Sequence, residues 1–370
     1  MRAWVLHGIG DIRLETAGEP ELAEGEVLVK VKAAGICGSD IPRIYKTGAY
    51  SYPLIPGHEF SGVVTAVGGR VNGQNPAGPA APAGAKEISG IDGSEGWLGQ
   101  RVGVFPLIPC GKCMPCRKKQ YEMCRSYSYL GSRRDGGFAE YVAVPSKNLI
   151  RLPDRVSFEA AAMLEPMAVA VHAMRGMMPA PSDRVVVCGL GTIGLLLVMF
   201  LREAGIDKIL VIGNKDFQKQ MVLKMGVGED FYCDSREMDV RKWVAGHTDG
   251  MGADVFFECV GKTDTYSLGV ELAAPSGRIC LVGNPGSDME LEKQVYWKIL
   301  RNQLVVKGTW NSSFTHEAGD DWHYVMERIS GNRVVPEELI SHRPGFEELE
   351  KGLCVMRDKT EDYVKVMGVF

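Results

Sequence analysis

The chain has 370 residues, of which 45% are hydrophobic and 24% are charged. This length is about twice that of a common domain, so we expect two folded lobes and exclude a small disulfide-stapled fold. The chain carries 42 Lys and Arg against 46 Asp and Glu, a net charge of -4, which argues against nucleic acid as a partner. The apolar runs stay shorter than the roughly eighteen residues of a membrane helix, so we expect a cytoplasmic protein that binds no membrane.

Short β-type segments separated by Gly and Pro dominate the first part of the chain. The clearest are EVLVKVKAAGI at residues 26–36 and FSGVVTAVG at residues 60–68, which predict a mostly antiparallel β lobe. Residues 72–96 are rich in Gly, Pro and Ala and contain few large apolar side chains. They predict a long exposed loop, which is either a surface insertion without function or a lid over the substrate.

Helical and strand patterns alternate after residue 155. We expect a helical segment at 156–176, strands at 184–189, 208–213, 253–261 and 277–283, and helices at 193–205, 216–226 and 267–275. Alternation of this kind predicts a doubly wound parallel sheet of the nucleotide-binding type. Beyond it, residues 322–331 and 346–358 read as helices and residues 363–370 as a final strand.

Four cysteines crowd into one short segment: Cys110, Cys113, Cys116 and Cys124. Their spacing, C-x2-C-x2-C-x7-C, allows four thiolates to surround one tetrahedral Zn²⁺. An iron–sulfur cluster also takes four cysteines, but a single set in basic surroundings favours zinc. Because protein would fill every position, the predicted ion is structural.

A glycine motif, Gly189-Leu-Gly191-Thr192-Ile193-Gly194, follows the predicted strand at 184–189 and opens the next helix. In this context it predicts a dinucleotide-binding turn, whose glycines allow the backbone to approach a pyrophosphate at the helix N-terminus.

Cofactor choice depends on the end of the following strand, where an acidic residue normally holds the adenosine ribose. This chain has Gly213, Asn214 and Lys215 there, which favours NADP because a lysine can pair with a 2′-phosphate. In the alternative interpretation Lys215 is only solvated, Asp216 supplies the acid and the cofactor is NAD.

A second set of potential metal ligands is dispersed along the chain: Cys37, His58, Glu59 and Glu165. Taken singly, a Cys is more often a buried apolar residue and a His a hydrogen-bonded one. The same chain also contains a predicted nucleotide-binding lobe, as a metal-assisted dehydrogenase would. We therefore adopt the hypothesis that these residues bind a metal ion.

Six segments carry a family resemblance: GICGSD, GHEFSG, the four-cysteine segment, GSRRDGGFAEY, LEPMAVAVHA and GLGTIG. Together they resemble the zinc-dependent medium-chain dehydrogenases of the sorbitol dehydrogenase branch, over nearly the whole chain. The resemblance implies an α/β protein with three parts. A GroES-like β-barrel catalytic domain with the structural zinc loop covers residues 1–155, a Rossmann domain covers 156–310, and residues 311–370 return to the catalytic domain. It also implies a homodimer or homotetramer.

The resemblance also implies roles for individual residues. Cys37, His58 and Glu165 would hold a catalytic zinc, and Glu59 beside them would be an exchangeable ligand. Ser39 would hydrogen-bond the substrate oxygen, and Lys365 would lie near the cofactor pyrophosphate. The chain departs from many relatives at Pro42, which stands where they have a proton-relay histidine.

The function implied is hydride transfer between NADP or NAD and a secondary alcohol of a polyol or a polyol phosphate such as galactitol 1-phosphate, giving the ketose. Two alternatives stay open: a dehydrogenase of free polyols, aminocyclitols or L-threonine, and, more remotely, a metal-free NADPH-binding reductase. A phosphate could be held by arginines at four positions, although an arginine taken singly is more often a surface or structural residue. They are Arg43, Arg133, Arg134 and Arg343.

Overall fold

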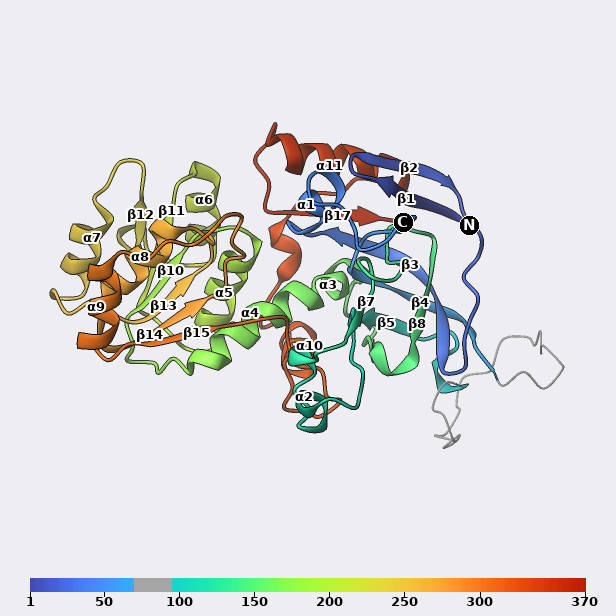
Figure 1. The fold of residues 1–370 in the computed structure, drawn as a ribbon, viewed down its shortest axis with the longest axis horizontal. Coiled ribbons are helices and arrows are strands. Elements are labelled where there is room, and N and C mark those ends of the chain that lie inside the picture. Colours follow the sequence, from blue (N-terminus) through green and yellow to red (C-terminus); the bar gives the residue numbers. More distant parts are fainter. Residues whose placement is uncertain (70–94) are drawn as a thin grey trace. The chain divides into compact units, whose positions relative to one another are not determined.

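The computed structural model describes residues 1–69 and 95–370, which form two compact units (Figure 1). The first unit comprises Met1–Glu165 and Ile340–Phe370, and the second comprises Pro166–Leu339. Most of the segment expected to be a loop or a lid, residues 72–94, lies outside the described residues.

The chain returns to the first unit at residue 340, later than the expected position 311. Helix α10 (Asp321–Ser330) stays with the second unit because its first residue is tied there. Asp321 accepts hydrogen bonds from His172 Nδ1 at 2.7 Å and from Arg175 Nη1 at 2.8 Å, and the adjacent Trp322 is buried.

A seven-stranded sheet forms the core of the first unit, in the order β16-β17-β3-β4-β5-β9 with β8 paired to β3. Its neighbours are antiparallel except β16 and β17, in agreement with the predicted antiparallel lobe. Alternate side chains such as Val29, Phe60 and Val102 are buried in one apolar cluster. The strands are β3 (Glu26–Ile36), β4 (Glu59–Val67), β5 (Arg101–Val104), β8 (Tyr141–Pro145), β9 (Leu149–Arg151), β16 (Ile340–His342) and β17 (Lys365–Val369).

Smaller elements complete the first unit. Strands β1 (Arg2–Gly8) and β2 (Asp11–Thr16) form a hairpin, and β6 (Leu107–Ile108) pairs with β7 (Ser128–Tyr129). The helices are α1 (Asp40–Tyr45), α2 (Met114–Arg117), α3 (Phe158–Ala162) and α11 (Leu349–Asp358). Strand β17 brings the C-terminal segment beside β3, with Val366 opposite Ile36.

The second unit contains a parallel six-stranded sheet in the order β12-β11-β10-β13-β14-β15, which confirms the predicted doubly wound fold. Its strands are β10 (Val185–Cys188), β11 (Ile209–Gly213), β12 (Tyr232–Asp234), β13 (Ala253–Glu258), β14 (Ala273–Leu281) and β15 (Val305–Gly308). The sequence did not predict β12 and β15, because these two are short and lie at the sheet edges, where little apolar pattern is required.

The helices of the second unit connect the strands as expected for such a sheet (Figure 1). They are α4 (Leu164–Met177), which begins just before the unit boundary, α5 (Thr192–Glu203), α6 (Asp216–Lys224), α7 (Val240–His247), α8 (Thr263–Leu272), α9 (Lys293–Arg301) and α10. Over residues 1–69 and 95–370, the chain forms no helix with the length and apolar character needed to cross a bilayer.

Candidate functional site

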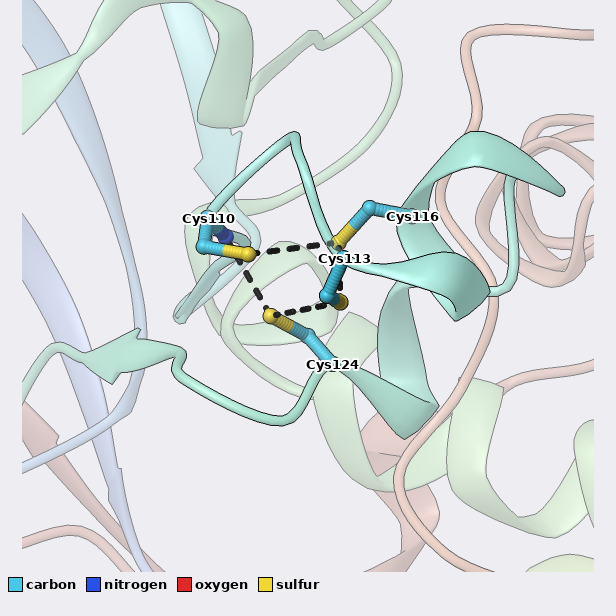
Figure 2. A group of neighbouring side chains, drawn as sticks. All are labelled: Cys110, Cys113, Cys116 and Cys124. Carbon is cyan, nitrogen blue, oxygen red and sulfur yellow. Dashed lines mark hydrogen bonds between the residues drawn. The ribbon is translucent and has the colours of Figure 1, made fainter.

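The four cysteines of the 110–124 segment meet around one point, as Figure 2 shows. The Sγ atoms of Cys113 and Cys116 are 3.4 Å apart, those of Cys113 and Cys124 are 3.9 Å apart, and those of Cys110 and Cys116 are 4.0 Å apart. A tetrahedron with Zn–S bonds of about 2.3 Å has edges of about 3.8 Å. The cluster therefore has the size and the donor set that a structural zinc ion requires.

The thiols of this cluster differ in their electrostatic surroundings. Backbone N–H groups, first that of Arg125, lower the pKa of Cys113 to about 6, while burial raises the pKa of Cys116 to about 12. A buried thiol beside a thiolate cannot ionise readily, so full ionisation of the four sulfurs needs a cation among them.

The dispersed candidate ligands also come together. The ligand atoms of Cys37, His58 and Glu59 all lie within 4.8 Å of one another. The antiparallel register of β3 and β4 explains the meeting, because Gly35 stands opposite Glu59 and Cys37 follows directly after β3. Cys37 and His58 are about twenty positions apart in the sequence, yet they lie at the same end of the β3–β4 pair. Their spacing alone did not show this.

A buried carboxylate lies behind His58. Asp40 Oδ1 is 3.4 Å from His58 Nδ1, and Asp40 also accepts hydrogen bonds from Cys37 N at 3.0 Å and Arg43 Nη1 at 2.7 Å. Burial lowers the pKa of His58, but the charges of Asp40 and Cys37 outweigh burial and hold it well above its usual value. A carboxylate behind a ligating imidazole fixes the ring orientation and increases its basicity.

Ser39 lies beside the same group, because its Oγ donates a hydrogen bond to Cys37 Sγ at 3.3 Å. The hydroxyl is therefore next to a candidate ligand atom, which agrees with its expected place near a substrate oxygen. The next helix, α1, begins at Asp40, so one short segment supplies the thiol, the hydroxyl and the carboxylate behind the histidine.

Glu165 lies near the cluster but outside it. Its Oε1 accepts a hydrogen bond from Tyr129 Oη at 3.1 Å, and its carboxylate is not among the atoms that lie within 4.8 Å of one another. Burial raises the pKa of Glu165 to about 7, and the charge of Glu59 adds to this, although His58 and Lys365 oppose it. The structure therefore brings Glu59, and not Glu165, into the group with Cys37 and His58.

Lys365 occupies an unexpected place. The family resemblance implied a place near the cofactor pyrophosphate, whereas in the structure its buried ammonium group contacts Glu59 Oε2 and donates to the carbonyl of Ile36 at 3.1 Å. Gly35 makes the room for this pair, because a Cβ atom there would stand 2.3 Å from Glu59 Oε2 and 2.8 Å from Lys365 Cε. A glycine inside a strand often indicates that another group approaches the backbone closely. Gly35 was therefore the feature of the sequence that could have indicated this pair.

The donor set of the group fits a catalytic zinc ion. One thiolate, one imidazole and one carboxylate give three protein ligands, which leaves a fourth position of the tetrahedron for water or substrate. His58 and Glu59 are buried, and because Nδ1 of His58 faces Asp40, Nε2 is the ring nitrogen left to ligate the ion. We therefore find that the residues present fit the ion that the sequence predicted.

The glycine motif forms the turn from β10 to α5. Gly189 has φ of 95°, and a Cβ atom at Gly194 would stand 1.9 Å from the Gly189 carbonyl oxygen, so this turn excludes side chains at both positions. A Cβ atom at Gly191 would meet nothing within 4 Å. The N-terminus of α5, with Thr192 and Ile193 in its first turn, is therefore open on the side where a pyrophosphate is expected.

Two basic side chains lie at the carboxyl end of β11. Lys215 precedes α6 and forms no ion pair within the described residues, whereas Arg236 pairs with both Asp216 and Asp234. Asp234 stands opposite Gly213 in the register of β11 and β12. The sequence missed Arg236 because β12, which positions it, was not predicted.

Comparisons with known proteins agree with this geometry. Residues 23–154 match the alcohol dehydrogenase GroES-like domain, and residues 192–331 match the zinc-binding dehydrogenase family. Galactitol 1-phosphate 5-dehydrogenase of Escherichia coli strain K12 is 32% identical over 345 residues, which cover 93% of each chain. The chain belongs to the zinc-dependent medium-chain alcohol dehydrogenases. It is therefore a zinc-dependent oxidoreductase that acts on CH–OH donors.

Other members of the family extend the comparison. Sorbitol dehydrogenase of Halalkalibacterium halodurans is 29% identical over 98% of this chain and 96% of its own. The crystal structure of galactitol-1-phosphate dehydrogenase from Escherichia coli has a TM-score of 0.86 and 31% identity, with full coverage of both chains. A zinc-binding dehydrogenase from Sinorhizobium meliloti, solved with NADP, has a TM-score of 0.83 and 27% identity over 100% and 99% of the two chains.

Proposed function

We propose that this dehydrogenase oxidises a secondary alcohol of a polyol or polyol phosphate to the ketose, with NADP as the hydride acceptor. The observation that carries the proposal is the cluster of Cys37, His58 and Glu59 in the first unit, in which His58 and Glu59 are buried and Cys37 is half-buried. The 32% identity to galactitol 1-phosphate 5-dehydrogenase over nearly the whole chain supports the substrate class.

Each residue of the cluster has a distinct task in this proposal. Cys37, His58 and Glu59 would hold the catalytic zinc, which when bound acts as a Lewis acid on the substrate oxygen. Ser39, whose Oγ lies against Cys37 Sγ, would hydrogen-bond that oxygen and relay its proton, giving up its own hydroxyl proton to solvent as it accepts the substrate's. Asp40 orients His58, and Lys365 balances the charge of Glu59.

Glu165 keeps a secondary place in the proposal. The family resemblance implied Glu165 as a zinc ligand and Glu59 as an exchangeable one, but of the two only Glu59 lies in the ligand group with Cys37 and His58. The second zinc would be held by the four cysteines, away from the chemistry, which makes two zinc ions in each chain.

Lys215 supports the choice of NADP. Asp216, the alternative ribose acid, is paired with Arg236, and its side chain is 83% exposed. Arg236 also pairs with Asp234, whereas Lys215 forms no ion pair within the described residues, so its ammonium group is available to a 2′-phosphate. The glycine turn at Gly189–Gly194 would hold the pyrophosphate.

We also propose a homodimer formed through β15. This strand lies at one edge of the six-stranded sheet, where an unpaired backbone can add a strand from a second copy. Large apolar side chains on β15 and its neighbours are at least 46% exposed, an unusual feature for a monomer. They are Tyr296, Trp297, Leu300, Val305 and Trp310. Val305→Lys would shift the mass in light scattering from dimer to monomer.

The proposed location is the cytoplasm. All ten cysteines of the chain are free thiols in the structure, which is typical of a reducing compartment.

Purified protein loaded with zinc tests the function directly. We expect NADP reduction with galactitol 1-phosphate, sorbitol or both, and loss of turnover in His58→Ala with nearly intact cofactor binding. L-Threonine is the control substrate, because relatives named L-threonine 3-dehydrogenase are 30% identical to this chain. Turnover of L-threonine alone, or wild-type rates in His58→Ala, would contradict the proposal.

A further inference from the structure

The structure separates the four arginines that the sequence offered for phosphate binding. Three are paired with carboxylates: Arg43 with Asp40 at 2.7 Å, Arg134 with Glu26 at 2.7 Å, and Arg343 with Glu159 at 3.0 Å. The fourth, Arg133, forms no ion pair within residues 1–69 and 95–370. Its positive charge is therefore available to a ligand.

Aromatic rings hold the Arg133 side chain in place. Its guanidinium carbon is 4.3 Å from the ring centroid of Tyr127 and 4.5 Å from that of Tyr50, and its Nη1 donates to the Tyr127 carbonyl at 2.9 Å. Stacking of this kind uses the faces of the planar group and leaves edge N–H donors for hydrogen bonds. Arg133 is half-buried and Tyr50 is 73% exposed, so the group is accessible from solvent.

The loop that carries Arg133 is fixed against the segment before His58. Gly137 N donates to Gly57 O at 2.7 Å, and Gly136 N donates to Ile55 O at 2.8 Å. A Cβ atom at Gly131 or Gly136 would stand 2.5 Å or 2.0 Å from the Gly57 carbonyl oxygen. Only glycine permits this contact, and it sets the place of Arg133 relative to His58.

A row of aromatic side chains connects Arg133 with the metal-ligand cluster. The ring centroids of Tyr127 and Tyr129 are 6.1 Å apart, and those of Tyr129 and His58 are 5.7 Å apart. Arg133 and His58 therefore lie at opposite ends of one continuous set of packed rings within the first unit.

We infer that Arg133 binds the phosphate group of the substrate, and that the substrate is a phosphorylated polyol. In such a molecule the phosphate is at one end of the carbon chain and the oxidised hydroxyl lies toward the other, which matches a fixed arginine at one end of the ring set and the ligand cluster at the other. Arginine suits this role because its N–H groups bind two phosphate oxygens at once. The inference rests on the proposed function and specifies its substrate class.

The test compares galactitol 1-phosphate with galactitol as substrates of wild-type protein, Arg133→Gln and Arg133→Lys. We expect the wild type to prefer the phosphate ester. Arg133→Gln should lower kcat/KM for the ester by at least about ten- to a hundredfold, the effect of losing even one of the two charge-assisted hydrogen bonds, and change kcat/KM for galactitol less than twofold. Arg133→Lys should retain part of the preference, since it keeps the charge without the planar fork.

Arg134→Gln is the matched control, since it removes a charge from the same loop but from an arginine already paired with Glu26. It should leave the ratio of the two kcat/KM values unchanged. Inorganic phosphate should compete with the ester in the wild type and not in Arg133→Gln, which tests binding even if the variant turns over slowly.

An equal fall for both substrates in Arg133→Gln would mean that Arg133 only braces the loop, and would overturn the inference. A wild-type preference for galactitol over galactitol 1-phosphate would also overturn the inference, but it would leave the proposed function, oxidation of a polyol, intact. Absence of turnover with every polyol and polyol phosphate would instead contradict the proposed function itself.

Discussion

Lys365 and Glu59 form a buried ion pair between β17 and β4, over a gap that Gly35 leaves in β3. Both side chains are at most 2% exposed. The pair joins the last strand of the chain to a candidate metal ligand, and it cancels the charge of Glu59. A zinc ion held here would then carry one uncompensated anionic ligand, the Cys37 thiolate. It would polarise a substrate oxygen more strongly than an ion with two such ligands, because each anion reduces the effective charge of the metal.

Removal of Lys365 tests the strength of this pair. Lys365→Met leaves Glu59 charged and buried without its partner, so we expect the free energy of unfolding to fall by about 3–5 kcal/mol. The double variant Lys365→Met with Glu59→Gln should recover most of that loss, because it removes both charges. Denaturant unfolding of the metal-free variants gives the comparison, and an additive loss in the double variant would contradict the pairing.

The two nearby carboxylates can be told apart by metal content. We expect Glu59→Ala to lose the labile zinc ion and Glu165→Gln to keep it, since Glu59 lies within the ligand group and Glu165 hydrogen-bonds Tyr129. Elemental analysis after mild dialysis against a chelator measures the difference. The opposite order would restore Glu165 as the ligand, as the sequence alone suggested.

The four-cysteine cluster should hold a second ion far more tightly. We expect about two zinc ions in each wild-type chain and one in Cys113→Ser, with a lower unfolding temperature in the variant, because a structural zinc site contributes to folding. Cys354→Ser is the control, since Cys354 lies on α11, away from the cluster. A folded, active wild type with only the labile ion would refute the four-thiolate site.

Local pattern predicted the elements that are long and buried. Strand β3 has the bounds expected from its sequence, and β10, β11 and β13 lie within theirs, because continuous apolar runs next to glycines leave few alternatives. The short edge strand β12 lacks such a run, so Arg236 after it was not recognised as a neighbour of Gly213.

Some residues of the candidate sites could be predicted to lie together from the sequence, and others could not. The four clustered cysteines are close in the sequence, so their spacing alone predicts that they meet in space. Cys37, His58 and Glu59 meet only because of the register of β3 against β4. The partnership of Lys365 with Glu59 spans almost the whole chain and requires the pairing of β17 with β3. Such long-range register is set by tertiary packing, and one sequence does not display it.

Asp321 gives the second unit a dependence on pH. Burial raises its pKa, but hydrogen bonds from His172 and Ser313 outweigh burial and hold the pKa below its usual value. A lowered pKa stabilises the folded state above about pH 4, and the stabilisation is lost as the pH falls below that value. Asp321→Asn should therefore unfold more easily at pH 7, by about 1–3 kcal/mol, and lose less stability on acidification. Thermal unfolding at pH 7 and pH 3.5 measures both effects, with the exposed Asp264→Asn as the control that should follow the wild type.

Lys215 at the end of β11 forms no ion pair within the described residues, and in the proposed function it sets the cofactor preference. We expect a lower KM for NADP than for NAD, because one charge-assisted contact with the 2′-phosphate is worth about 1.5–3 kcal/mol, or roughly ten- to a hundredfold in affinity. Lys215→Ser should remove most of that preference, whereas Lys224→Ser, at the other end of α6, should not change it.

A full reversal toward NAD needs an acid at the strand end, and the obvious variant is Gly213→Asp with Lys215→Ser. The structure shows what this acid would meet: a Cβ atom at Gly213 would stand 2.9 Å from Tyr232 Oη and 3.1 Å from Gln218 Oε1. We therefore expect the reversal to require Tyr232→Phe as well, which removes the oxygen nearest to the new Cβ atom. Titration with 2′,5′-ADP and 5′-AMP measures the preference without turnover. Tighter binding of 5′-AMP by the wild type, or an unchanged ratio in Lys215→Ser, would contradict the assignment of the 2′-phosphate to Lys215.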